Sequence, residues 1–142
     1  MAHVRESHDT TSPVTVKRYA GACGAEISGV DLAKDLSDAS VINAIRSALL
    51  EHLIIFFYNQ AHLSPADFLA FTKNFGAPVK YPIISGLANH PEIIEVLKRK
   101  HERTNFGGVW HFDTIYLNQP PIASILLARE LPPYDGDMCF AN

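Results

Sequence analysis

The chain has 142 residues, of which 47% are hydrophobic and 19% charged, with a formal net charge of −3. This composition is ordinary for one modest globular domain with a core, and it gives no indication of nucleic acid or an anionic membrane as a partner. No apolar run is long enough to span a bilayer, so we expect no membrane segment. Residues 1–13 are polar and lack the apolar core of a signal peptide, which predicts a disordered N-terminal tail before a domain over residues 14–142.

The first third of the chain predicts strands around one helix. Alternating β-branched residues favour a strand over residues 14–19, and glycines bound a short expected strand at residues 25–27. Ser37 is the expected N-cap of an amphipathic helix that ends at about His52. The continuous apolar run 53–57 then predicts a strand buried on both faces.

A second helix is expected to begin at Ser64. An N-cap serine, Pro65 at the first helical position and Asp67 three residues after the cap form a strong start signal. The pattern indicates that this helix ends near Asn74, just before Gly76.

The sequence of the second half of the chain predicts mostly strands. Apolar and β-branched runs predict strands at residues 93–97, 110–116, 122–128 and 138–141, with a solvated charged loop at residues 98–103. The predicted fold class is therefore mainly β with flanking helices (α+β).

The chemistry-bearing stretch contains His111 and Asp113. In a strand, residues i and i+2 point to the same face with Cα atoms roughly 7 Å apart, so both side chains could reach one small cation. An imidazole and a carboxylate are two of the three ligands in the facial triad that holds non-heme Fe(II). A surface histidine beside a solvated aspartate is the alternative interpretation, because this pair is common by chance.

Several separated motifs in order resemble the TauD/TfdA family of Fe(II)- and 2-oxoglutarate-dependent dioxygenases, which act on taurine, phenoxyacetate herbicides and related acids. The resemblance runs from about Tyr19 to Asn142. The motifs that carry it are Gly24–Leu32, Phe75-Gly76, Asn105–Asp113, Pro120-Pro121, Ala128–Pro133 and Gly136-Asp137.

The resemblance implies a double-stranded β-helix, a jelly roll of the clavaminate synthase-like and TauD type, of which residues 14–142 would form the N-terminal half. It implies that His111 and Asp113 are iron ligands, whereas the family's third histidine and its 2-oxoglutarate-binding arginine lie further on. The implied reaction needs Fe(II), 2-oxoglutarate and O2, and it hydroxylates a small organic acid while 2-oxoglutarate is decarboxylated to succinate and CO2. A fragment with two ligands should be inactive alone; a homo-oligomer is left open for the full-length protein.

Three further positions concern the cosubstrate and the substrate. Met138 stands where the family usually has a threonine that helps to hold 2-oxoglutarate, and a thioether cannot donate that hydrogen bond. Tyr81 aligns with a sulfonate-binding histidine of the taurine branch, which argues against taurine; a rim aromatic is the alternative. Asn105 is expected to line the pocket or to cap a turn. We expect Trp110 and Phe112 to pack in the core.

Two other functions remain open. The chain could be a truncated or degenerate, non-catalytic relative, which Met138 favours, or the His-x-Asp pair could hold zinc for hydrolysis. The zinc interpretation ranks last because no general base with a clear partner is visible. Cys23 and Cys139 lack metal or redox spacing, which favours buried free thiols in a reducing compartment and a cytoplasmic protein. A disulfide is the alternative.

Overall fold

The computed structural model describes residues 13–103, 107–134 and 136–142. The predicted tail, apart from Pro13, and Asn105 therefore lie outside the described residues. The chain divides into two compact units, one made of residues 1–62 and 128–142 and the other of residues 63–127. Among the described helices, none has the length and apolarity needed to cross a membrane.

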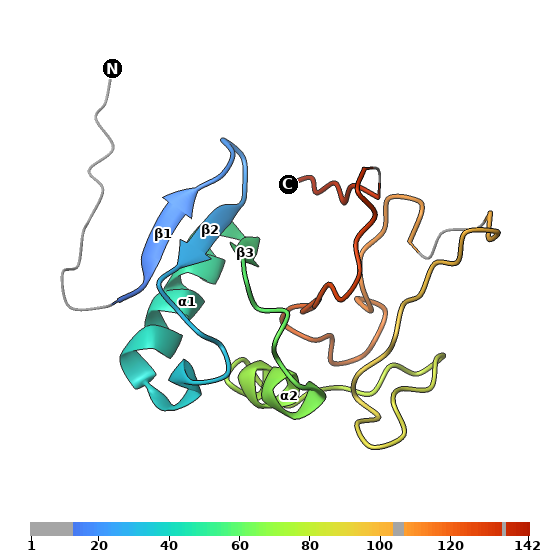
Figure 1. The fold of residues 1–142 in the computed structure, drawn as a ribbon, viewed down its shortest axis with the longest axis horizontal. Helices are drawn as coiled ribbons and strands as arrows, with labels where there is room; N and C mark the ends of the chain where they lie inside the picture. Colours follow the sequence, from blue (N-terminus) through green and yellow to red (C-terminus); the bar gives the residue numbers. More distant parts are fainter. Residues whose placement is uncertain (1–12, 104–106, 135) are drawn as a thin grey trace. The chain divides into compact units, whose positions relative to one another are not determined.

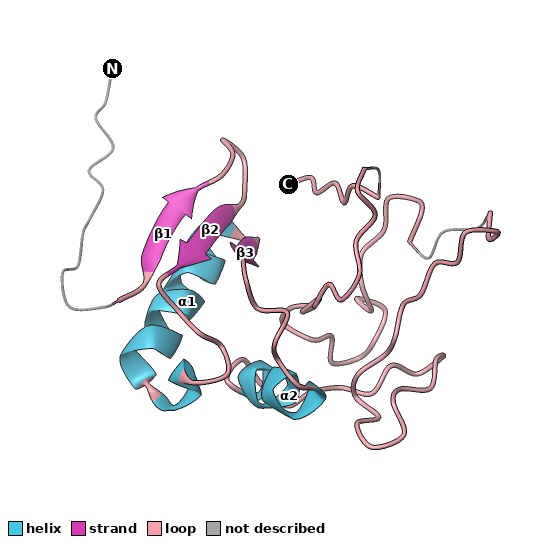
Figure 2. Cartoon of the chain, viewed as in Figure 1, coloured by secondary structure: helices cyan, strands magenta, loops and turns pink. Residues whose placement is uncertain are grey.

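A three-stranded sheet forms the first unit's centre (Figures 1 and 2), in the order β1 (Thr15–Arg18), β2 (Ala25–Ser28) and β3 (Ile55–Phe57). β1 pairs antiparallel with β2, and β2 pairs parallel with β3. All three strands were predicted from the sequence within about two residues. The predicted burial of the third strand on both faces is wrong, because β3 is an edge strand and its residues are half-buried.

The helix α1 (Ala39–His52) connects β2 to β3, and it follows a short 3₁₀ helix, η1 (Asp35–Ser37). Ser37 is not its N-cap, which corrects the sequence prediction. Asp38 caps the helix instead, because its Oδ1 accepts hydrogen bonds from the backbone N–H groups of Ser40 at 2.8 Å and Val41 at 3.4 Å. The Ser40 hydroxyl donates to the same oxygen, and these bonds lower the pKa of Asp38.

The core of the first unit lies between α1 and the sheet, since α1 contacts both β2 and β3. The buried residues of α1 recur at three- and four-residue intervals and so form one apolar stripe. Ile45 has 0% of its surface exposed and is among the largest fully buried side chains. The buried apolar residues of this unit are Ala25, Ile27, Leu32, Val41, Ile42, Ile45 and Ala48.

The second unit begins with α2 (Pro65–Lys73), and its start signal is confirmed in detail. The Ser64 hydroxyl accepts the backbone N–H of Asp67 at 3.2 Å, and the Asp67 carboxylate accepts the backbone N–H of Ser64 at 3.0 Å. This reciprocal capping box satisfies two N–H groups that a helix terminus would otherwise leave without partners. The helix ends with Asn74 as its C-cap, as the sequence predicts.

Beyond α2, the described residues contain no further strand, so the strands predicted at 93–97, 110–116, 122–128 and 138–141 are wrong. The described pairing there is a single isolated bridge between Leu87 and His90. The reason is that strand hydrogen bonds come from a neighbouring strand, so an apolar run alone does not make a sheet. Residues 121–127 still alternate between half-buried and exposed, as in an extended chain.

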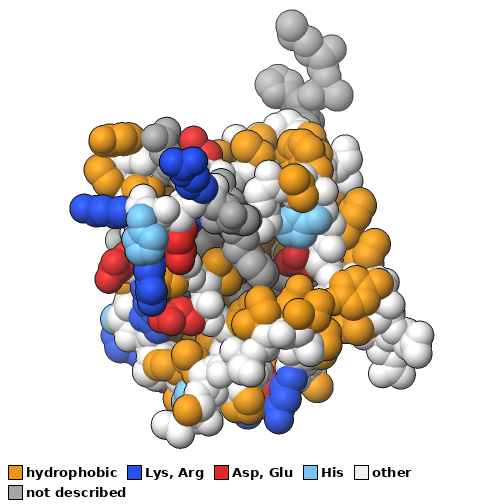
Figure 3. Space-filling view, turned by 90° about the vertical axis from the view of Figure 1, so that its right-hand side faces the viewer, with side chains coloured by type: hydrophobic (Ala, Val, Ile, Leu, Met, Phe, Trp, Pro, Cys, Tyr) orange, Lys and Arg blue, Asp and Glu red, His pale blue; other side chains and the backbone are white. Residues whose placement is uncertain are grey.

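The sheet and the two helices bear out the α+β class. The expected predominance of β structure is not found, because more of the described residues lie in α1 and α2 than in the three strands, and the described residues form no jelly roll. Several side chains expected in the core are exposed instead. Trp110 is 74% exposed and Phe112 79% exposed. Cys23 and Cys139 are free thiols, as expected, but one is half-buried and the other exposed. Figure 3 shows many hydrophobic side chains open to solvent on one face of the molecule.

Candidate metal centre

His111 and Asp113 lie in a loop of the second unit, and their side chains nevertheless converge. His111 Nε2 lies 3.3 Å from Asp113 Oδ1, and the two side chains are 49% and 55% exposed. Thr114, directly after the pair, is buried and has a positive φ of 48°, and its carbonyl accepts the backbone N–H of Leu117 at 3.1 Å. A tight turn therefore follows the pair, in place of the continuous strand that the sequence predicts.

The tautomer of His111 follows from its second nitrogen. His111 Nδ1 lies 2.7 Å from the carbonyl oxygen of Val109. A carbonyl can only accept, so Nδ1 carries the proton and donates it. In the neutral ring Nε2 then has a lone pair, and that lone pair faces the Asp113 carboxylate oxygen. Two acceptors at this distance repel each other until a cation, either a proton or a metal ion, lies between them.

The Asp113 carboxylate has its own partner on its second oxygen. The hydroxyl of Ser124 donates to Asp113 Oδ2 at 2.7 Å, which leaves Oδ1 facing the imidazole. Sequence analysis missed Ser124. The available signal was a hydroxyl in the middle of the apolar run 122–128, where a buried strand would leave a polar group without a partner.

Gly107 lies against the imidazole ring. A Cβ atom at this position would be 3.0 Å from His111 Cε1, and the φ of Gly107 is +71°. A side chain here would press on the ring and would also occupy a backbone region that L-residues rarely adopt. The glycine therefore leaves room for the imidazole in the orientation that brings Nε2 to Asp113.

The donor set fits a divalent cation such as Fe(II), which is bound in facial triads by neutral imidazole and carboxylate with open positions. Two protein ligands alone hold such an ion weakly. Among the described residues, no group of three or more His, Cys, Asp or Glu side chains could complete a metal site.

Tyr81 is joined to the same loop through Tyr116. Partial desolvation, followed by the charge interaction and the side-chain hydrogen bond with Tyr81, raises the pKa of Tyr116, which lies three residues after Asp113. Tyr81 also lines a cavity of about 350 Å³ whose apolar wall includes Ile84. No motif or spacing in the sequence singled out Tyr116.

Asn105 and Met138 are the remaining predicted site residues. Asn105 lies outside the described residues. Met138 belongs to the first unit and is 63% exposed.

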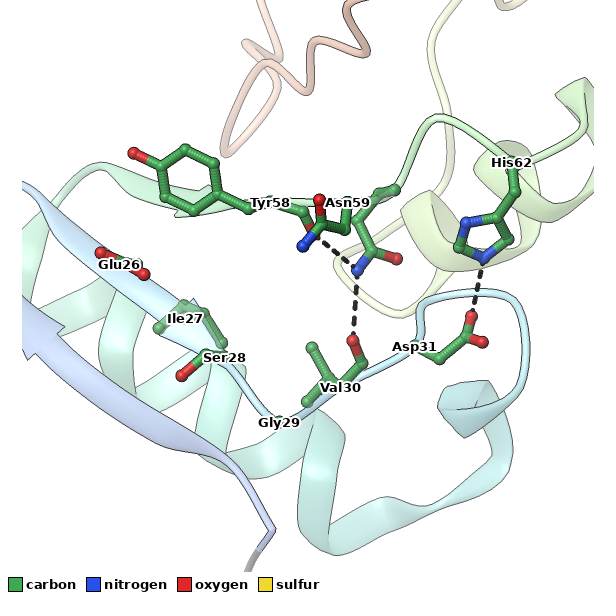
Figure 4. Close-up of a pocket in the computed structure, with 10 residues that line it drawn as sticks. Glu26, Ile27, Ser28, Gly29, Val30, Asp31, Tyr58, Asn59 and His62 are labelled. Atoms are coloured by element: carbon green, nitrogen blue, oxygen red, sulfur yellow. Dashed lines mark hydrogen bonds and ion pairs between the residues drawn. The ribbon is translucent and has the colours of Figure 1, made fainter.

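A polar cavity of about 290 Å³ lies in the first unit (Figure 4). The side chains of Gln60 and His62 bind other groups that line it. The amide nitrogen of Gln60 donates to the carbonyl of Val30 at 3.1 Å, and His62 Nε2 lies 2.9 Å from Asp31 Oδ1. The ammonium of Lys34 and the imidazole of His62 lower the pKa of Asp31 well below its usual range. These contacts hold two loops of the unit together, which accounts for His62 without a ligand.

The fold and the pair define an α+β protein in which an imidazole nitrogen lies beside a carboxylate oxygen, two donor types that bind divalent metal ions in proteins. The chain belongs to the family described as taurine catabolism dioxygenase TauD, TfdA family, whose model matches residues 15–142. The resemblance seen in the sequence is thereby confirmed.

Two curated relatives are similar over most of this chain. An alkylsulfatase of Acinetobacter baylyi is 36% identical over 132 residues, which are 93% of this chain and 40% of the relative. An alpha-ketoglutarate-dependent sulfate ester dioxygenase of Pseudomonas putida is 37% identical over 127 residues, which are 89% of this chain and 41% of the relative. The chain therefore spans about two fifths of the length of these relatives.

A solved structure shares the fold of part of the chain. The crystal structure of a taurine dioxygenase from Burkholderia xenovorans superposes with a TM-score of 0.51 at 33% sequence identity. The match covers 56% of this chain and 28% of that one. It supports the assignment of the α+β segment to this family.

Proposed function

We propose that the whole protein containing this chain is an Fe(II)- and 2-oxoglutarate-dependent dioxygenase that oxidises a small organic acid, and that residues 14–142 are the N-terminal half of its jelly-roll domain. The observation that carries the proposal is the approach of His111 Nε2 and Asp113 Oδ1 to 3.3 Å, with His111 Nδ1 directed to the Val109 carbonyl. Bound Fe(II) would supply oxygen activation coupled to decarboxylation of 2-oxoglutarate to succinate and CO2.

The residues of this chain then have separate tasks. His111 and Asp113 would hold the metal, with His111 fixed in its ligating tautomer by the Val109 carbonyl. The hydroxyl of Tyr81, linked to Tyr116, would donate to the acid group of the substrate. Asn105 would line the same pocket, and Met138 would lie beside 2-oxoglutarate.

Alkyl sulfate esters are the first substrate class to test, because two similar proteins are named for sulfate esters. A hydroxyl group placed on the carbon that bears the sulfate gives an unstable adduct. That adduct breaks its C–O bond, releasing an aldehyde and sulfate. Turnover should therefore produce succinate, CO2, aldehyde and sulfate in equal amounts, whereas taurine should be a poor substrate because Tyr81 replaces a sulfonate-binding histidine.

Anaerobic titration of the whole protein with Fe(II) and 2-oxoglutarate tests the assignment directly. We expect a weak visible charge-transfer band and succinate formation that both disappear in His111→Ala and Asp113→Ala. His101→Ala is the matched control, because His101 is exposed on a loop. Turnover retained by either ligand variant would show that the ligand assignment is wrong, and tight zinc binding without the band would favour the hydrolytic alternative.

Met138 motivates the second candidate, a non-catalytic relative, because it replaces a hydroxyl donor. A hydrogen bond to a charged group contributes about 1.5–3 kcal/mol, so Met138→Thr should lower the KM for 2-oxoglutarate by at least about tenfold. Steady-state kinetics in the whole protein would measure this. An unchanged KM would mean that this side chain does not contact the cosubstrate, and a wild type without metal binding or turnover would favour the non-catalytic relative.

A further inference from the structure

Among the described residues, each of the two proposed metal ligands has a directing contact on the side away from the other ligand. For His111 the contact is the Val109 carbonyl, which fixes the ring tautomer. For Asp113 it is the hydroxyl of Ser124, which donates to Oδ2 at 2.7 Å while Oδ1 faces His111 Nε2 at 3.3 Å. One contact comes from the backbone and the other from a side chain that can be substituted.

We infer that Ser124 is a positioning residue that orients the Asp113 carboxylate for metal binding through Oδ1. This inference rests on the proposed function, because it needs a metal ion at His111 and Asp113. Hydrogen bonds to metal-binding carboxylates and imidazoles fix ligand orientation, and their loss typically weakens metal affinity or activity by about 10–100-fold.

The exposure of the pair explains why such a contact matters. The Asp113 side chain is 55% exposed, so packing alone leaves its terminal torsion free to rotate and to exchange its two oxygens. The Ser124 hydroxyl binds one of these oxygens and thereby distinguishes it from the other. A donor on Oδ2 also reduces the negative charge available there, which favours a single metal bond through Oδ1 over chelation by both oxygens.

The contact also joins two segments that are separate in the sequence. Ser124 lies eleven residues after Asp113, within the extended stretch whose alternate side chains are half-buried. An exposed surface serine with no role would be satisfied by water. Here its hydroxyl is directed to a carboxylate, and a charge-assisted O–H···O⁻ bond of this kind is stronger than a bond between neutral groups.

The test measures Mn(II) affinity of the whole protein, without substrate or turnover, by the loss of the free-ion electron paramagnetic resonance signal. Ser124→Ala should raise the Kd for Mn(II) by about tenfold, the lower end of the range for such partners. Ser124→Thr keeps a hydroxyl and should remain within about threefold of wild type on the same grounds. Ser47→Ala, on the exposed face of α1, is the matched serine control and should bind as wild type.

Thermal unfolding of the metal-free variants separates positioning from folding. Unchanged Tm values together with weakened Mn(II) binding in Ser124→Ala support the inference. Wild-type affinity in Ser124→Ala, equal weakening in Ser124→Thr, or a large fall in Tm for the metal-free Ser124→Ala would each overturn it. Failure of the proposed function looks different: the wild-type protein would bind Mn(II) no better than His111→Ala or Asp113→Ala.

Discussion

The two units differ in how their apolar residues are used. In the first unit, β2 and α1 bury one face against each other, and Ile45 is fully enclosed. In the second unit, the helix α2 is the regular element among the described residues. In the part of the unit after α2, the side chains of Trp110, Phe112 and Ile115 are largely exposed. Yet the second unit carries the candidate metal pair. Stability and chemistry therefore reside in different parts of this chain.

The difference shows what each kind of structure needs. A helix satisfies its hydrogen bonds within four residues, and β1 and β2 are near neighbours in the sequence. The apolar runs at 110–116 and 122–128 have a composition typical of strands, as β1 and β2 do. Among the described residues, however, no partner strand pairs with these runs. Among the described residues, polar contacts order the His–Asp pair: the Val109 carbonyl, the Ser124 hydroxyl and the turn that begins at Thr114.

The largest expected effect is a difference between the two units in the free energy of unfolding that an Ile→Ala substitution removes. Ile45→Ala removes a fully buried side chain and should lower the free energy of unfolding by about 2–5 kcal/mol. Ile115→Ala makes the same chemical change at a site that is 61% exposed and should cost no more than about 0.5 kcal/mol. Urea unfolding of both variants measures the contrast, and equal losses would show that Ile115 is buried in the whole protein.

A smaller effect should appear at the metal pair. Gly107→Ala places a Cβ 3.0 Å from His111 Cε1 at a positive φ, so we expect it to displace the ring and to weaken Mn(II) binding by about tenfold. Gly21→Ala is the matched control, because a Cβ there meets nothing within 4 Å. If both variants bind Mn(II) as tightly as wild type, the loop adapts and the glycine is not required.

The smallest effect concerns the cap of α1 and depends on pH. The folded state lowers the pKa of Asp38, so the ionised cap stabilises the protein above the unfolded pKa of about 3.9 and loses that contribution as the pH falls through the lower folded value. The stability gap between wild type and Asp38→Ala should therefore be full at pH 6 and shrink below about pH 3.9.

Chemical denaturation at pH 6 and at pH 3 would measure the gap. Asp38→Asn provides the comparison, because asparagine keeps the capping oxygen and does not titrate. A gap that stays constant over this pH range would mean that the charge of Asp38 contributes nothing to the cap.

The three strands and both helices could be predicted from the sequence, whereas one helix cap and the later strands were predicted wrongly. The capping box at Ser64 was identified because its partners are three residues apart. The N-cap of α1 was misplaced by one residue, since Ser37 and Asp38 are both good caps and only the hydrogen bonds to Ser40 and Val41 decide between them. The strands after α2 were predicted from composition, which reports burial preference but does not identify a partner.

The sequence by itself determined the family, the helices and the residue types able to hold a metal ion, because these depend on local spacing and motif order. Only the tertiary structure decided that His111 Nε2 is the nitrogen that faces Asp113, and that Ser124 holds the opposite carboxylate oxygen. The physical reason is the sequence separation of the residues that interact. Helix hydrogen bonds and caps join residues at most four positions apart, whereas strand pairing and side-chain orientation depend on atoms that the folded chain brings together from separate segments.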